Sequence, residues 1–115
     1  MNPHRHEVPS RLLLDFDKAN VVTPRIEPPQ PRLVVTGTKP SPVMKVQLVP
    51  LAYAKMPPYW EIQVVGTPPG KDEPTHLPAD LPTEFTVELD LEGLTGTVGI
   101  VVVGAEHNER IEVST

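Results

Sequence analysis

The sequence predicts an all-β protein, a single antiparallel β-sandwich of about seven strands of the immunoglobulin-like or fibronectin-like kind. Alternating apolar and polar runs recur about every ten residues, with almost no helical periodicity between them. Phe, Trp and Tyr are scarce, so Val, Leu and Ile must form the core, and these residues favour strands. All 16 prolines lie in residues 1–82. A small β-barrel is the alternative.

Residues 1–10 are predicted to be a flexible N-terminal arm, and residues 11–115 to be the single β-sandwich domain. Four strands are expected before the long loop, over residues 11–16, 32–37, 43–53 and 59–65. Period two turns one set of side chains inward on the last two of these strands: Met44, Val46, Leu48, Trp60, Ile62 and Val64. Because Pro50 cannot donate to a β-ladder, it should mark an edge, a bulge or a bend.

Residues 83–115 contain no proline and are therefore the best candidate for the middle of a sheet. Three strands are expected here, over residues 84–92, 97–103 and 109–113, and short polar turns would join them into an antiparallel meander. The second of these strands is apolar at successive positions, which is typical of a strand buried on both faces.

Composition excludes several classes of function. The chain has no cysteine, which rules out disulfides, thiolate metal sites and cysteine nucleophiles and fits a cytoplasmic protein. It has no signal-peptide pattern and no apolar run approaching about 20 residues, so no membrane association is expected. Residues 1–58 carry eight Lys and Arg against four Asp and Glu, a charge of +4; residues 59–115 carry two against eleven, a charge of −9. The acidic half argues against nucleic acid as a partner.

No catalytic site, cofactor or metal site is predicted. His4 and His6 supply only two ligands, and neither His76 nor His107 has a partner at a spacing that indicates a catalytic triad. The chain is therefore expected not to be an enzyme. Carboxylates line one face of the strand at residues 84–92, and we interpret them as a solvated acidic face opposite basic residues rather than as a calcium site.

Two proline-rich segments are candidates for recognition. Residues 25–31 match an Arg-x-x-Pro-x-x-Pro pattern, although a rigid connector between sheets is the preferred interpretation. Residues 66–82 form a long loop with five prolines, and loops of this length are often functional. The Cys-Trp-Cys pattern of antibody domains is absent, so any likeness to them is architectural.

The predicted contact surface surrounds the break between two strands at residues 53–60, where both tyrosines and the single tryptophan occur. Its residues are Tyr53, Lys55, Met56, Tyr59 and Trp60. Trp60 shares the apolar face of its strand and is expected mainly to fill the core. The first hypothesis is a non-enzymatic module that binds a protein partner through this corner and the long loop. The alternatives are a small-ligand or carbohydrate-binding sandwich and a structural protomer that self-associates through its edge strands.

Overall fold

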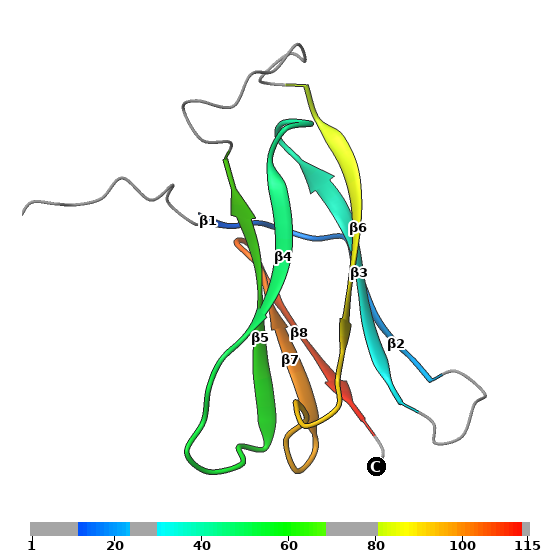
Figure 1. The fold of residues 1–115 in the computed structure, drawn as a ribbon, viewed down its shortest axis with the longest axis vertical. Coiled ribbons are helices and arrows are strands. Elements are labelled where there is room, and N and C mark those ends of the chain that lie inside the picture. Colours follow the sequence, from blue (N-terminus) through cyan, green and yellow to red (C-terminus); the bar gives the residue numbers. More distant parts are fainter. Residues whose placement is uncertain (1–11, 24–29, 69–80, 114–115) are drawn as a thin grey trace, which may run out of the picture.

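The computed structural model describes residues 12–23, 30–68 and 81–113, which form eight β-strands and no helix (Figure 1). Four of the strands precede the β4–β5 connection: β1 Leu12–Leu13, β2 Lys18–Val22, β3 Arg32–Lys39 and β4 Lys45–Pro50. The other four follow it: β5 Tyr59–Thr67, β6 Thr83–Asp90, β7 Gly99–Val103 and β8 Asn108–Glu112. The predicted arm at residues 1–10, His4, His6, His76 and most of the two proline-rich segments lie outside the described residues.

The strands form two sheets that pack face to face, as predicted for a sandwich. In the larger sheet, β4, β5, β7 and β8 lie in this order, and β1 pairs with the end of β5 beyond the part that pairs with β7. The smaller sheet has the order β2, β3, β6. β4 contacts β6 and β2 contacts β8 across the two layers. Among the described residues no strand pairing joins the two sheets, so they do not close into a barrel.

The core is built from the rows of side chains that face inward from both sheets. The most deeply buried of them come from the three central strands: Leu33, Val35, Ile62, Val64, Ile100 and Val102. The partly exposed Val46, Trp60, Val87 and Leu89 pack against this cluster. These rows confirm the period-two alternation predicted for β4, β5 and β6.

The predicted first strand, residues 11–16, is wrong as a continuous element. After β1 the chain crosses from the larger sheet to the smaller one: Leu14 N donates to Val64 O at 2.9 Å, and Asp17 N donates to Thr36 O at 2.8 Å. The sequence analysis missed β2, because its Lys-Ala-Asn start has little intrinsic β-propensity. Backbone pairing with β3 along all five residues forms it nonetheless.

The predicted antiparallel meander in the last third is also wrong. β6 pairs with β3 at the edge of the smaller sheet, whereas β7 and β8 form a hairpin in the larger sheet. β7 runs parallel to β5, so the sheets are not purely antiparallel. The reason is the route of the chain, which reverses once into β6 and once more into β7. Two reversals restore the direction of β5.

The distribution of proline identifies edges better than centres. Among the described residues β4 pairs only with β5 and ends at Pro50, so of the predicted edge, bulge or bend the edge is confirmed. The proline-free β6 and β8 are nevertheless edge strands, because a missing proline permits pairing on both sides without requiring it. β7 is central, but it is not buried on both faces as predicted: Val101 and Val103 are only half-buried on its outer side.

Candidate functional site

The candidate site lies at the end of the sandwich where β4 is connected to β5. The connection, residues 51–58, first extends the β-ladder, because Leu51 N donates to Glu61 O at 3.0 Å. Trp60, on β5, also holds this connection in place, because its Nε1 donates to Leu51 O at 2.9 Å. The indole ring therefore packs against the core with its only polar atom satisfied, as expected for a tryptophan that fills the core.

Tyr53 is held against Trp60 and β5. The two rings meet edge to face, with centroids 5.1 Å apart and an interplanar angle of 78°. The Tyr53 hydroxyl oxygen accepts a hydrogen bond of 3.3 Å from Glu61 N. Tyr53 is consequently half-buried and fixes the path of the loop that follows it.

A second loop, residues 91–98 between β6 and β7, is clamped to this connection by backbone hydrogen bonds. Pro57 O accepts from Thr97 N, and Pro58 O accepts from Val98 N, both at 2.9 Å. Gly96 makes this approach possible, since a Cβ at its position would overlap both proline carbonyl oxygens. Two loops that are about 40 residues apart in sequence thus form one continuous end.

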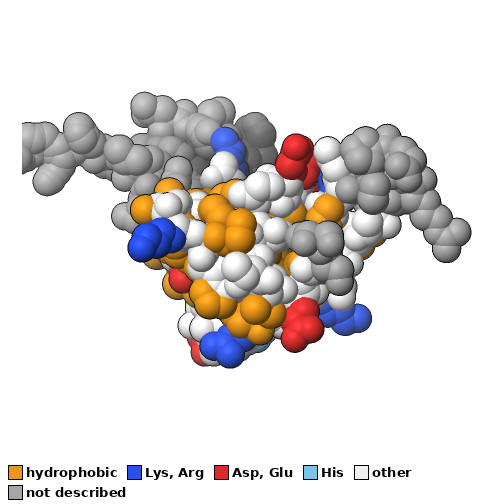
Figure 2. Space-filling model, turned by 90° about the horizontal axis from the view of Figure 1, so that it is seen from below, with side chains coloured by type: hydrophobic (Ala, Val, Ile, Leu, Met, Phe, Trp, Pro, Cys, Tyr) orange, Lys and Arg blue, Asp and Glu red, His pale blue; other side chains and the backbone are white. Residues whose placement is uncertain are grey.

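The outer surface of the clamped loops is mainly apolar. Met56 is 61% exposed and Val98 is 37% exposed, and Ala54, Lys55 and Pro58 are exposed beside them. We call residues 53–58 together with 97–98 the loop-end surface. Figure 2, which views this end of the sandwich, shows several apolar side chains on it, with both basic and acidic side chains around its margin.

The structure divides the five predicted contact residues among three places. Tyr53, Lys55 and Met56 belong to the loop-end surface, whereas Trp60 faces the core. Tyr59 has the opposite parity on β5 and lies on the outer face of the larger sheet, where the Arg110 guanidinium carbon is 5.1 Å from its ring centroid. Sequence reasoning missed Val98 and Arg110, because tertiary pairing alone brings them to residues 53–60.

His107, which lacked a partner by sequence spacing, pairs with Asp15. Its Nδ1 lies 2.9 Å from Asp15 Oδ1, and because a carboxylate only accepts, Nδ1 carries the proton. The same oxygen accepts from Glu106 N at 3.2 Å, and the His107 ring stacks on Phe16 with centroids 4.3 Å apart. The pair therefore fastens the β7–β8 turn to the crossing between sheets.

We expect Asp15→Ala to lower the free energy of unfolding by about 1 kcal/mol, because it removes one acceptor shared by two exposed donors. Urea denaturation measures the loss, and amide hydrogen exchange in residues 104–107 should accelerate. Asp17→Ala, at an exposed neighbouring carboxylate, serves as the control. Equal stability of the two variants would contradict a structural role for Asp15.

The acidic strand face has the basic neighbour that was predicted for it. Arg32 Nε lies 3.4 Å from Glu88 Oε1 across β3 and β6, with both side chains about half exposed. Asp90 Oδ1 accepts from Glu92 N at 3.0 Å, and Glu92 Oε1 accepts from Gln30 Nε2 at 3.3 Å. In the described part of the chain, no group of three or more His, Asp or Glu residues is placed to hold a metal ion.

Within residues 12–23, 30–68 and 81–113, no helix is long and apolar enough to cross a membrane. Comparison of the chain with protein-family models, with curated proteins and with solved structures found no match.

Proposed function

We propose that the protein is a non-enzymatic β-sandwich module that binds a protein partner through the loop-end surface. The observation that carries this proposal is the exposure of Met56 and Val98 on two loops that backbone hydrogen bonds hold together. Methionine and aromatic residues are enriched in protein interfaces. A surface already ordered before binding loses less conformational entropy when a partner docks.

The arrangement of the aromatic rings favours a protein partner over a carbohydrate. A sugar ring stacks on an open aromatic face. The Trp60 ring packs against the core, and it also contacts the Tyr53 ring edge to face. Tyr59 lies beneath Arg110. The features left exposed are the methionine, valine and proline side chains and the Lys55 ammonium group, which suit a protein surface.

The immunoglobulin-like or fibronectin-like class belongs to the same proposal. Two stacked sheets support it, whereas the parallel pairing of β5 with β7 departs from the antiparallel sheets of that class. A cytoplasmic setting and a partner other than nucleic acid are further parts of the proposal, supported by the lack of cysteine and by the acidic charge of residues 59–115.

Site-specific photo-cross-linking tests the surface. A benzophenone amino acid at position 56 or 98 should give a discrete cross-linked product in extract of the native host, and the same group at position 22 should not. Val22 is a suitable control because it is 50% exposed on β2 in the other sheet. The captured protein is then purified, and its affinity is measured by calorimetry.

We expect Met56→Asp to weaken that affinity by about tenfold or more, because it places a charge in an apolar contact, whereas Val22→Asp should have little effect. Absence of a product at positions 56 and 98, the same product at position 22, or equal affinities of the two variants would overturn the proposal.

A further inference from the structure

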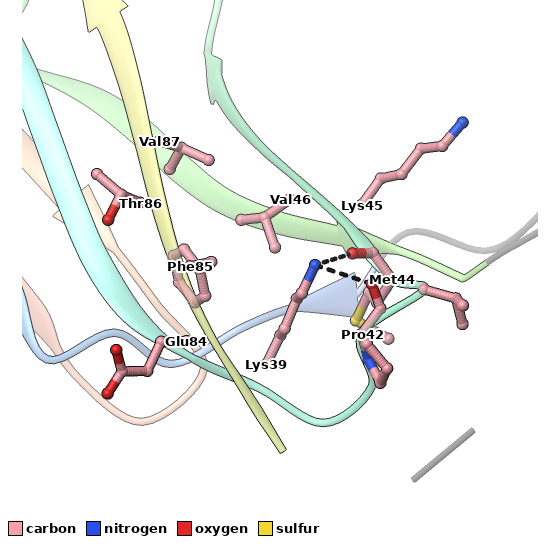
Figure 3. Close-up of a pocket in the computed structure, with 10 residues that line it drawn as sticks. Lys39, Pro42, Met44, Lys45, Val46, Glu84, Phe85, Thr86 and Val87 are labelled. Carbon is pink, nitrogen blue, oxygen red and sulfur yellow. Dashed lines mark hydrogen bonds between the residues drawn. The ribbon is translucent and has the colours of Figure 1, made fainter. Parts of the chain in front are cut away.

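A groove of about 550 Å³ opens on one side of the sandwich between β4 and β6 (Figure 3). Each of these strands has a free edge among the described residues, since β4 pairs only with β5 and β6 only with β3. The apolar wall of the groove comes from Met44, Val46, Phe85 and Val87. An unpaired strand edge beside an apolar groove is the arrangement in which an extended peptide adds to a sheet.

Lys39 supplies a positive charge at one end of the groove. Its side chain follows the inward row of β3, and Nζ donates to Met44 O at 2.8 Å and to Pro42 O at 3.3 Å. Figure 3 shows the ammonium group beside Val46. An ammonium group has three donors, so two carbonyl acceptors leave one donor for another partner. The ion pairs found among the described residues do not include Lys39.

Within the described part of the chain, the half-buried Lys39 ammonium group contacts only neutral oxygens, and a carboxylate is its best complement. Charge-assisted hydrogen bonds to a carboxylate are about twice as strong as neutral ones. Partial burial also strengthens the attraction, because less water screens it. Among the described residues, Glu84 is the one acidic residue that lines the groove, and Figure 3 shows its carboxylate directed away from Lys39.

The direction of β4 and β6 indicates whether this carboxylate belongs to a side chain or to the C-terminus of a bound peptide. β4 begins next to Met44, and β6 begins at Thr83, which is paired with Lys39, so both strands start at the end occupied by the ammonium group (Figure 1). A strand that adds antiparallel to either edge runs toward this end. Its carboxyl terminus therefore arrives at Lys39.

The charges of the two edges favour β4. The outward side chains of β6 include Glu84, Glu88 and Asp90, which repel a peptide that ends in a carboxylate. β4, with the sequence Lys-Val-Gln-Leu-Val-Pro, carries no acidic side chain. Pro50 lacks an N–H group, so pairing along β4 is limited to residues 45–49.

We propose that this groove binds the free C-terminal end of an extended peptide, which adds antiparallel to β4 with its terminal carboxylate on Lys39. Alternate apolar side chains of the peptide cover Val46 and Val87, and the other side chains face solvent. This binding site is separate from the loop-end surface, so either proposal can fail without the other.

The first probe is a fluorescein-labelled hexapeptide of alternating valine and threonine that has a free C-terminal carboxylate. Fluorescence anisotropy with the full chain should show saturable binding, and amidation of the C-terminus should weaken it by about tenfold or more. A third peptide, amidated but with glutamate at the last position, distinguishes a terminal carboxylate from one on a side chain. We expect it to bind like the plain amide.

Lys39→Met keeps the unbranched side chain, one atom shorter, and removes its charge. We expect this variant to bind the acid and amide peptides equally, with an affinity close to that of the wild-type protein for the amide. Lys18→Met, at an exposed lysine on β2, should retain the preference for the acid. Circular dichroism confirms that both variants are folded. In NMR spectra of the protein, the changes in backbone amide chemical shift caused by the peptide should be largest at residues 45–49 of β4.

Equal binding of the acid and amide peptides to the wild-type protein would overturn the proposal. An absence of binding at millimolar peptide, or chemical-shift changes confined to β6, would also overturn it. So would binding of the amidated peptide that ends in glutamate with an affinity equal to or higher than that of the acid peptide. Light scattering tests the other occupant, a second copy of the chain. A dimer that protects the amides of β4 from hydrogen exchange and excludes the peptide would also refute the proposal.

Discussion

Phe16→Ala is expected to lower the free energy of unfolding by about 3–5 kcal/mol, as is typical for loss of a buried phenylalanine. Phe16 is 2% exposed and fills the space where the chain crosses between the sheets. Gly37 and Gly104 leave room for it: a Cβ at Gly104 would lie 2.8 Å from Phe16 Cδ1, and a Cβ at Gly37 would lie 3.0 Å from Phe16 Cα. With glycine at both positions, neither position 37 nor position 104 supplies a side chain that could fill the cavity.

Urea denaturation monitored by Trp60 fluorescence measures this loss. Phe16→Leu should cost less, about 1 kcal/mol, and it keeps the comparison possible if the alanine variant does not fold. Val22→Ala, at a side chain that is half exposed, should change stability by less than about 0.5 kcal/mol. A loss below about 1 kcal/mol for Phe16→Ala would show that the crossing does not depend on this ring.

Gly99→Ala is expected to cost more than about 3 kcal/mol, because its methyl group has no space in the hairpin formed by β7 and β8. A Cβ at this position would overlap Ile111 O and lie 2.8 Å from Glu112 Cα. Both atoms belong to the backbone of β8, so no side-chain rotation can relieve the clash. The pairing of Gly99 with Glu112 must be lost or shifted.

Gly93→Ala is the matched control for this variant. Gly93 has a φ of +74°, but no atom lies within 4 Å of a Cβ built on it, so only the left-handed backbone opposes alanine. That cost is about 1–2 kcal/mol. Denaturation curves of the two variants and hydrogen exchange of the Ile111 amide should separate them. Equal stability, or unchanged exchange in Gly99→Ala, would disprove the steric argument.

The sequence pattern predicted which side chains face inward more successfully than it predicted which strands are neighbours. The alternation in β4, β5 and β6 matches the buried rows around Leu48, Ile62 and Phe85, because period two is a local property of an extended chain. Pro50 marked an edge for a similarly local reason. β2 was missed because its pairing with β3, and not its composition, makes it a strand.

The candidate site likewise combines residues that the sequence could select with residues that only tertiary pairing brings there. Tyr53, Lys55 and Met56 could be selected because they are consecutive around a Pro-Pro break. Val98 could not, because hydrogen bonds from residues 97–98 to Pro57 and Pro58 bring it there. The groove likewise needs Lys39, Val46 and Val87, which come from three strands and two sheets.

By itself, the sequence determined that the chain is all-β, which faces of most strands are buried, and that Pro50 lies on an edge strand. Only the tertiary structure decided that β6 joins β3, that β7 runs parallel to β5, and that the free edges of β4 and β6 open on the same side. The physical reason is that backbone N–H and C=O groups are the same in nearly every residue, so a strand edge accepts many neighbours. Packing of the inward rows against each other over long separations in sequence selects one of them.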